Sequence, residues 1–196
     1  MNWDERYSEP GFVYGTDANE FLVSVVNQIP RGKILSLAEG EGRNAVYLAS
    51  LGYDVTGVDG SEVGLHKAQA LAVERGVAIT TIHADLSHFE IGHEQWDGII
   101  ASYCHVPSAI RIPLHHAAVR GLKPSGVFVL EAYSKEQLTY DTGGPQSLDM
   151  LMSLDDVKRE LAGLEFRHAV QVEREVREGS RHTGLASVIQ IVGIKS

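Results

Sequence analysis

The chain has 196 residues, of which 43% are hydrophobic and 22% charged, a composition that is ordinary for a globular protein. Its formal net charge of −9 disfavours nucleic acid as a partner, because phosphate binding needs a basic surface. A single cysteine and the lack of an apolar segment of membrane-span length favour a cytoplasmic protein without a membrane partner. We therefore expect one domain over residues 1–196, as a monomer or a homodimer, whose partner is a small molecule or small anion.

The N-terminal part predicts an arm, a helix and the first strand. Residues 1–16 form a polar and aromatic arm. Asp17-x-x-Glu20 has the pattern of a capping box, and apolar residues at helical spacing predict a helix over residues 21–29. An apolar run then ends in a glycine-rich turn, and helical spacing resumes directly after it. This strand, turn and helix occupy residues 34–51.

Strand and helix patterns continue to alternate along the chain. Ser61 and Ser153 have the pattern of helix N-caps, and Lys123-Pro124-Ser125-Gly126 predicts a turn before a strand. The further apolar runs lie at residues 53–58, 78–84, 96–102 and 127–131. Such alternation predicts a three-layer, doubly wound α/β fold, in which helices cover both faces of a mostly parallel sheet.

The C-terminal tail has a different pattern. Residues 166–176 and 185–194 are strand-like, and a polar turn separates them, which predicts a hairpin. If the first of these strands is parallel to the others, its turn lies at the edge of the sheet where ligands bind. That turn carries Arg177, Arg181 and His182, which could hold an oxyanion. An exposed polar turn is an equally good interpretation of the same residues.

The glycine-rich turn predicts a cofactor that contains adenosine. Gly40 and Gly42 allow close approach of a ligand to the backbone, and the following helix offers free N–H groups. Asp59 ends the next strand, where an acid can accept hydrogen bonds from ribose hydroxyls. With Ala45, the turn also fits the dinucleotide pattern G-x-G-x-x-A. The turn alone leaves both a nicotinamide and a sulfonium cofactor open.

Acids at the ends of the first three strands, followed by the K-P-x-G turn, resemble the class I S-adenosylmethionine-dependent methyltransferases. The resemblance implies a seven-stranded sheet closed by a C-terminal antiparallel hairpin. It implies that Asp59 binds the ribose and that Asp85 with Leu86 frames the adenine. The residues implied to line the cofactor site, mostly at its methionine end, are Tyr14, Glu39, Gly40, Glu41, Gly42, Arg43, Gly60, Ser61 and Ser102.

Other segments resemble the tellurite-resistance methyltransferase family, relatives of the thiopurine methyltransferases. They are residues 3–7, 12–15, 39–44, 143–145 and 178–184. Two positions depart from the class pattern, since Ser36 stands where an acid is usual and Ala38 where a glycine is usual. Either Glu39 or Glu41 compensates for Ser36, or the cofactor binds more weakly.

The resemblance implies methyl transfer from S-adenosylmethionine to a small acceptor, such as a soft chalcogen oxyanion or a thiol. Two other classes stay open, a nicotinamide-dependent reductase and a non-catalytic adenosine-binding module. His105 is a candidate base, and Cys104 is either a thiolate nucleophile or, by preference, a small residue that lines the pocket. The nine histidines show no metal-ligand spacing, so we expect no metal site. Tyr7, Tyr14 and the loop at residues 133–145 could form a lid.

Overall fold

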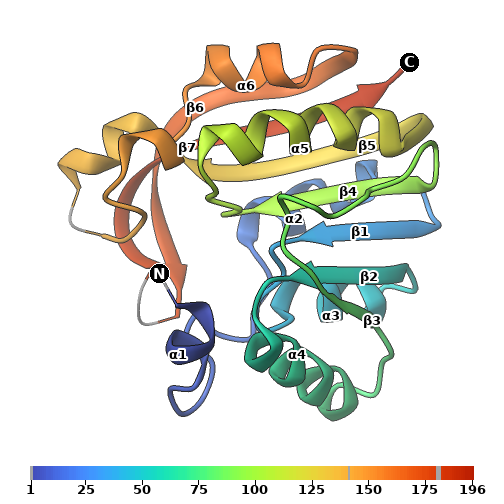
Figure 1. The fold of residues 1–196 in the computed structure, drawn as a ribbon, viewed down its shortest axis with the longest axis vertical. Helices are drawn as coiled ribbons and strands as arrows, with labels where there is room; N and C mark the ends of the chain where they lie inside the picture. Colours follow the sequence, from blue (N-terminus) through green and yellow to red (C-terminus); the bar gives the residue numbers. More distant parts are fainter. Residues whose placement is uncertain (1, 141, 180–181) are drawn as a thin grey trace.

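The computed structural model describes residues 2–140, 142–179 and 182–196. Seven strands form one sheet in the order β3-β2-β1-β4-β5-β7-β6, and Figure 1 shows this sheet running through the centre of the molecule. The strands are β1 (Lys33–Leu37), β2 (Asp54–Asp59), β3 (Thr80–His83), β4 (Trp96–Ser102), β5 (Leu122–Tyr133), β6 (Leu164–Glu178) and β7 (His182–Lys195). Strands β1 to β5 are parallel, so their carboxyl ends meet at one edge.

The helices are α1 (Trp3–Tyr7), α2 (Glu20–Val25), α3 (Arg43–Ser50), α4 (Glu62–Glu74), α5 (Ser108–Gly121) and α6 (Leu154–Glu160). Short 3-10 helices are η1 (Val26–Gln28), η2 (Lys135–Thr139) and η3 (Leu148–Met150). Side-chain caps form at Ser61 and Ser153, as the sequence predicts. Helix α2, however, is capped by Asn19 rather than Asp17, because the Asn19 side chain accepts a hydrogen bond from the Leu22 N–H.

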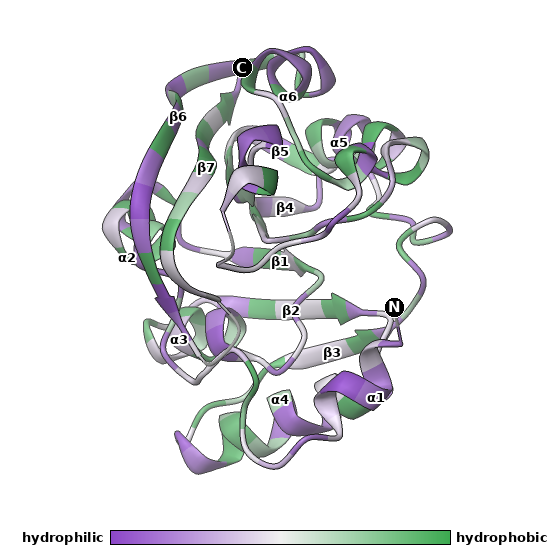
Figure 2. Cartoon of the chain, turned by 90° about the vertical axis from the view of Figure 1, so that its left-hand side faces the viewer, coloured by the Kyte–Doolittle hydropathy of each residue, from purple (hydrophilic) through white to green (hydrophobic). Residues whose placement is uncertain are grey.

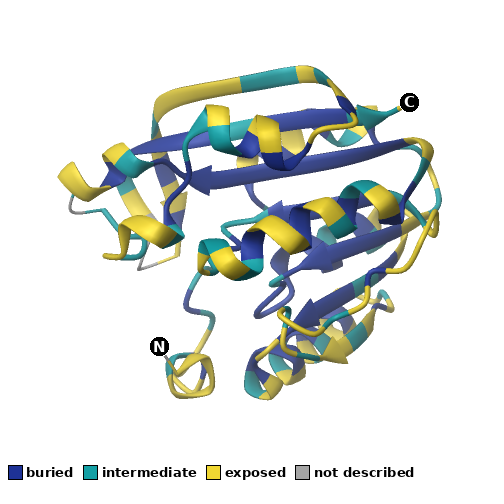
Figure 3. Ribbon diagram, turned by 45° about the horizontal axis from the view of Figure 1, so that its top comes forward, coloured by how far each residue is buried: buried dark blue, intermediate teal, exposed yellow. Residues whose placement is uncertain are grey.

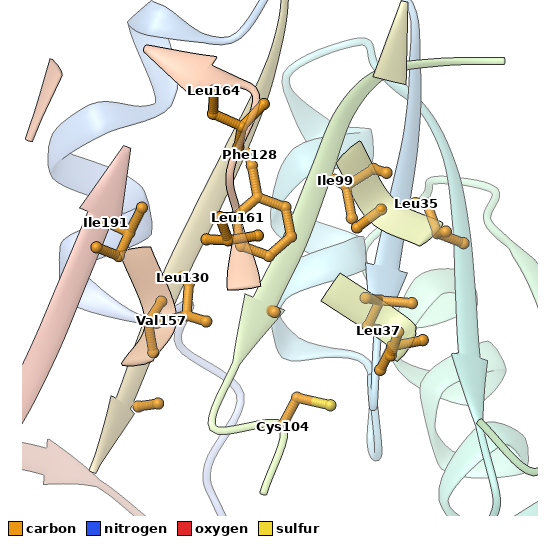
Figure 4. Packing of buried hydrophobic residues seen from close by; sticks show 14 of the residues in the cluster. Leu35, Leu37, Ile99, Cys104, Phe128, Leu130, Val157, Leu161, Leu164 and Ile191 are labelled. Carbon is orange, nitrogen blue, oxygen red and sulfur yellow. The ribbon is translucent and has the colours of Figure 1, made fainter. Parts of the chain in front are cut away.

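Two apolar clusters lie on opposite faces of the sheet and give the fold its three layers. On one face, Leu35 and Phe128 pack with residues of α5 and α6, and Figure 4 shows this packing. On the other face, Ile34 and Val129 pack with residues of α2, α3 and α4. Neighbouring residues such as Ile34 and Leu35 point to opposite faces because side chains alternate along a strand. Figure 3 shows the residues of the central strands as buried. The three-layer prediction is confirmed.

The C-terminal hairpin closes the sheet as predicted. Strand β7 is antiparallel to β5 and to β6, so β6 runs in the same direction as the parallel strands. Both hairpin strands are longer than the apolar pattern indicates, and pairing continues as far as Glu178 and His182. The pattern ended early because β6 is an edge strand with many exposed residues, and Figure 2 shows hydrophilic residues along it. The K-P-x-G turn likewise lies inside β5, with Ser125 at a φ of 64°.

Candidate cofactor and acceptor site

The glycine-rich turn after β1 packs against both α1 and α4. Gly40 has a φ of 62° and Gly42 a φ of 95°, values that favour glycine. A Cβ on Gly42 would lie 2.6 Å from the Cα of Ala68, so only glycine lets α4 approach this closely. A Cβ on Gly40 would lie 2.5 Å from the Tyr7 hydroxyl oxygen. The first helix of the arm therefore packs directly against the turn.

Asp59 joins the glycine-rich turn to the start of α4. One carboxylate oxygen accepts the Gly40 N–H at 2.8 Å, and the other accepts the Ser61 N–H at 2.8 Å. Burial raises the pKa of this carboxyl group above its usual value. Each oxygen keeps a lone pair, and Asp59 lines a cavity of about 340 Å³, so both can also accept ligand hydroxyls.

The 340 Å³ cavity brings together the residues predicted for the adenosine part of the cofactor. Asp59 and Gly60 line it from β2, and Asp85 and Leu86 line it from the loop after β3. One oxygen of Asp85 accepts hydrogen bonds from the Ser87 N–H and hydroxyl at 2.8 Å and 2.7 Å, which lower the pKa of Asp85. We name this space the adenosine lobe. The residues present fit an adenosine, since carboxylates stand where hydroxyl and amino groups need acceptors.

A larger cavity of about 850 Å³, which we name the main cavity, adjoins the adenosine lobe. Its volume lies within the roughly 300–1,000 Å³ that is usual for small-molecule sites. The residues that line both spaces are Trp3, Tyr7, Ala38, Tyr103, His105 and Val106. The predicted residues that line only the main cavity are Tyr14, Glu39, Glu41, Arg43 and Ser102. Residues 143–147 also line the main cavity, and three of them belong to the loop at residues 133–145 that was expected to form a lid.

Glu41 fastens the arm to the glycine-rich turn. One of its oxygens accepts the Val13 N–H at 2.8 Å and the Tyr14 N–H at 3.4 Å. The other oxygen pairs with the Lys67 ammonium at 2.9 Å, and the same ammonium donates to the Glu9 and Gly11 carbonyl groups. These contacts occupy the Glu41 carboxylate with the protein itself.

Glu39 is a buried carboxylate on the wall of the main cavity. It accepts a hydrogen bond from the Ser36 hydroxyl and another from the Ala45 N–H at 2.9 Å, at the start of α3. Burial raises the pKa of Glu39 to about 7, although both hydrogen bonds and the Arg43 charge lower it. The Ser36 hydroxyl thus contacts the Glu39 carboxylate rather than that of Glu41.

We expect Glu39 to make stability depend on pH in a defined direction. Its folded pKa is about 7 against an ordinary 4.5, so between these values the folded state binds more protons than the unfolded state. The free energy of unfolding, relative to that of a Glu39→Gln variant, should therefore fall as the pH rises from about 4.5 to about 7 and stay level above. Urea unfolding of both proteins across this range measures the difference. A difference that rises with pH would contradict the raised pKa.

His105 lies on the cavity wall, but its ring nitrogens bind the backbone. Nε2 accepts the Tyr133 N–H at 3.2 Å, and Nδ1 lies 3.0 Å from the Met150 carbonyl oxygen. An N–H can only donate and a carbonyl can only accept, so the ring is neutral with its proton on Nδ1. Its ring also stacks on Tyr133, with centroids 5.5 Å apart. This geometry favours a role in shaping the wall over the predicted role as a base.

Cys104 belongs to the apolar core rather than to the cavity wall. It is buried in the cluster with Leu37 and Leu130, as Figure 4 shows, and it lines neither cavity. Burial raises the pKa of its thiol to about 12. Its place in the core and this raised pKa argue against the thiolate nucleophile considered from the sequence, and its absence from both cavity walls corrects the expectation of a pocket-lining residue.

The hairpin end brings Glu178, rather than Arg177, toward the site. Because β6 continues through Glu178, alternation buries Val176 and Glu178 and leaves Arg177 exposed, away from both cavities. This corrects the expectation that Arg177 faces the acceptor. Arg181 lies outside the described residues, and the same holds for the His182 side chain, so their predicted roles stay predictions.

The Glu178 carboxylate anchors the hairpin to the rest of the site. It accepts from the Arg43 guanidinium at 2.6 Å and from the Asn19 side-chain amide at 2.7 Å. The ion pair with Arg43 is almost fully buried. It neutralises the positive charge of Arg43 at the wall of the main cavity.

Trp3 and Arg6 of α1 also line the main cavity. The Arg6 guanidinium donates to the Tyr14 hydroxyl at 3.0 Å and lies 5.4 Å from the centre of the Trp3 ring. Within the described residues, no carboxylate lies within 4.0 Å of Arg6. The W-D-E-R-Y segment carried the family resemblance, but no periodicity showed which of its side chains face inward.

Among the described residues, no helix is long and apolar enough to cross a membrane. Over the same described residues, no group of three or more His, Cys, Asp or Glu side chains could hold a metal ion.

Part of the chain matches a known protein family. Residues 34–126 match the family model described as a methyltransferase domain. That match covers β1 to the start of β5, including the glycine-rich turn, Asp59 and Asp85. The sheet order and this match make residues 34–126 similar to a methyltransferase domain.

Individual relatives support the same class. The 2-heptyl-1-hydroxyquinolin-4(1H)-one methyltransferase of Mycobacteroides abscessus is 26% identical over 145 residues, which are 72% of this chain and 64% of that protein. TehB of Haemophilus influenzae, a probable S-adenosyl-L-methionine-dependent methyltransferase, is 32% identical over 107 residues, which are 51% of this chain and 37% of TehB. The chain thus spans less than two thirds of the length of either relative.

Solved structures share the fold. The crystal structure of TehB from Haemophilus influenzae matches with a TM-score of 0.77 and 18% identity, over 100% of this chain and 68% of that one. A structure from a study of the conversion of a disulfide bond into a thioacetal group during echinomycin biosynthesis matches with a TM-score of 0.79 and 18% identity. That match covers 99% of this chain and 90% of the other.

Proposed function

We propose that the chain transfers the methyl group of S-adenosylmethionine to a small acceptor. The observation that carries the proposal is the continuity of two spaces, the adenosine lobe with Asp59 and Asp85, and the main cavity beyond Ala38. The first space suits the nucleoside, and the second has room for the methionine part and for an acceptor. A nicotinamide-dependent reductase fits less well, since Asp85 and the hairpin match the methyltransferase pattern.

When bound, the cofactor supplies a methyl group on a sulfonium ion. The residues of the chain align an acceptor with that methyl group and exclude water, which can supply much of the rate. An acceptor that is a soft anion or an ionised thiol needs no general base. The engagement of both His105 nitrogens with the backbone supports such an acceptor over a neutral hydroxyl group.

Calorimetric titration with S-adenosylmethionine, S-adenosylhomocysteine and NADH tests the proposal. We expect both sulfur compounds to bind and NADH not to bind. Binding of NADH without binding of either sulfur compound would replace the methyltransferase by a reductase. Binding of the sulfur compounds without methyl transfer to any thiol or chalcogen oxyanion would favour a non-catalytic module.

Arg6 supports an anionic acceptor. Of the two described cations that line the main cavity, Arg43 is neutralised by Glu178, whereas Arg6 is held by the neutral side chains of Tyr14 and Trp3. The Arg6 charge is therefore available to a ligand.

We expect Arg6→Gln to reduce turnover with an anionic acceptor by about tenfold or more, since a charge-assisted contact is worth roughly 1.5–3 kcal/mol. Selenite and a neutral thiol are suitable probes, because only the first should lose turnover strongly. Arg167→Gln, at an exposed arginine on β6, is the matched control. A loss of S-adenosylhomocysteine affinity with unchanged turnover at saturating cofactor would instead assign Arg6 to the cofactor carboxylate.

A further inference from the structure

We propose that Arg111, held by Glu160, is a positioning residue that fixes the acceptor side of the main cavity. The part of the chain that it fixes is residues 143–150, which we name the acceptor wall. The inference deepens the proposed function and rests on it for the identity of the ligand at this wall. Its basis is a buried arginine whose three guanidinium nitrogens are divided between a carboxylate and the backbone of the wall.

The acceptor wall lies apart from the residues expected to hold the cofactor. Residues 143–147 and Met150 line the main cavity, and none of them lines the adenosine lobe. The wall follows β5 along the chain, whereas the glycine-rich turn follows β1, and β4 separates these two strands in the sheet. Under the proposed function, a methionine part beside the turn leaves the space beside this wall to the acceptor.

Arg111 of α5 is held from the neighbouring helix α6 by Glu160. The two side chains are only 6% and 7% exposed. The Arg111 Nε lies 3.2 Å and 3.1 Å from the two Glu160 oxygens, and Nη2 donates to one of them at 2.9 Å. Glu160 also accepts from the His115 Nδ1 at 2.7 Å, and Figures 1 and 2 both show α6 beside α5. Because the guanidinium is planar, these contacts fix the direction of its remaining nitrogen.

That remaining nitrogen, Nη1, donates to the Asp149 carbonyl oxygen at 3.1 Å, inside the acceptor wall. The Asp149 carboxylate accepts the Ser108 hydroxyl, and also the Ser108 N–H at 3.1 Å, at the start of α5. The next carbonyl oxygen, that of Met150, lies 3.0 Å from Nδ1 of His105. Arg111 itself lines neither cavity, so it acts on a ligand through the wall.

Stability alone does not explain the buried pair of Arg111 and Glu160. A buried ion pair loses the hydration of both charges, and an apolar pair of similar size is often as stable or more stable. An apolar pair, however, has no donor to direct at the Asp149 carbonyl group. A lysine would keep the charge but would lack the fixed fork of donors. The arginine therefore fixes the position of the acceptor wall, which an apolar pair of equal stability would leave loose.

Hydrogen–deuterium exchange of the protein without ligand tests this positioning directly. In Arg111→Lys, amides of the acceptor wall, such as the Met150 N–H that donates to Ser147, should exchange about tenfold faster or more, because the wall loses a tie to α5. Exchange in residues 38–46, which contain the glycine-rich turn, should not change. Arg159→Lys, at an exposed arginine on α6, is the matched control that changes neither.

Steady-state kinetics tests whether the wall acts on the acceptor. With selenite and benzenethiol as probes, kcat/KM for the acceptor should fall about tenfold in Arg111→Lys. The KM for S-adenosylmethionine and the calorimetric affinity for S-adenosylhomocysteine should stay within about twofold. An arginine that only supports the fold would not separate the acceptor from the cofactor in this way.

A double variant covers the case in which Arg111→Lys is poorly folded. Arg111→Met combined with Glu160→Gln removes the ion pair without leaving a buried charge unpaired. It should unfold at nearly the same urea concentration as the unchanged protein, yet show the faster wall exchange and the lower kcat/KM for the acceptor. Unchanged wall exchange, or unchanged acceptor kinetics, in both variants would overturn the proposal. Equal losses for acceptor and cofactor would also overturn it, because they would indicate a general loss of structure.

The outcomes distinguish this inference from the proposed function. If the unchanged protein does not bind S-adenosylhomocysteine, the proposed cofactor is wrong. If it binds that compound but methylates neither probe, the proposed acceptor is wrong. In both cases the exchange data alone decide whether Arg111 holds the wall.

Discussion

Asp59→Asn should weaken binding of S-adenosylhomocysteine and of 5′-methylthioadenosine alike, by about 10-fold to 150-fold. The ribose is common to both ligands, and the loss of charge-assisted hydrogen bonds from its hydroxyls costs roughly 1.5–3 kcal/mol. Asparagine keeps one oxygen to accept the Ser61 N–H or the Gly40 N–H, but it cannot serve both.

The same substitution should also lower stability, by about 1–3 kcal/mol, because one buried N–H loses its acceptor. Urea unfolding without ligand measures this part separately from calorimetry. Asp85→Asn is a useful comparison, since Asp85 is exposed and its backbone contact lies within one local turn. Unchanged affinity in a folded Asp59→Asn protein would show that the ribose is held elsewhere.

Glu131→Ala should be the most destabilising single change considered, with a loss of about 3–5 kcal/mol, because it removes one partner of a buried ion pair. Glu131 lies at the end of β5 with no exposed side-chain surface, and it pairs with Arg174 of β6 at 2.8 Å. Its carboxylate also accepts hydrogen bonds from Asn19, Tyr103 and Gln190 at 2.8, 2.9 and 2.6 Å. One carboxylate thus joins α2, the cavity wall and the hairpin.

Denaturant midpoints of Glu131→Ala and Glu131→Gln measure this effect, and the glutamine variant should lose less because its oxygen still accepts. Glu165→Ala, with an exposed pair to Arg167, should change stability by less than about 0.5 kcal/mol. Cofactor affinity should fall in Glu131→Ala as well, because Tyr103 lines both cavities. A loss below 1 kcal/mol would show that Arg174 is satisfied by its other partners, Glu20 and Glu178.

Periodicity predicted the layers of this fold because its central strands are buried on both faces and its helices have one apolar face. Where an element is exposed on one side, the apolar pattern predicted it too short, as for β6, which continues beyond Val176. Capping was predicted where a serine stood alone before a helix. The predicted cap at Asp17 was wrong. Asn19 caps α2 instead, because it also makes tertiary hydrogen bonds to Asn44, Glu131 and Glu178.

The cofactor side of the site followed from the sequence more fully than the acceptor side. Residues at the ends of consecutive parallel strands meet by topology, so Asp59 and Asp85 could be brought together without coordinates. Arg6 and Glu178 lie far from the glycine-rich turn along the chain, and only the tertiary fold brings them to it. The sequence could not show that Glu41 is engaged by Lys67 and the arm, because Lys67 is brought to it only by the tertiary fold.

The arm has a consequence for the speed of ligand exchange. Trp3 and Tyr7 line both spaces, and the Asp4 carboxylate accepts the Ser61 hydroxyl at 2.5 Å, beside Asp59. Figure 1 shows α1 beside α4, at the edge where the hairpin end also lies. A bound cofactor would lie beneath a segment that is tied to the turn by Glu41 and Lys67. Under the proposed function, we expect release of the spent cofactor to require these ties to open, and arm opening to limit turnover at saturating substrate.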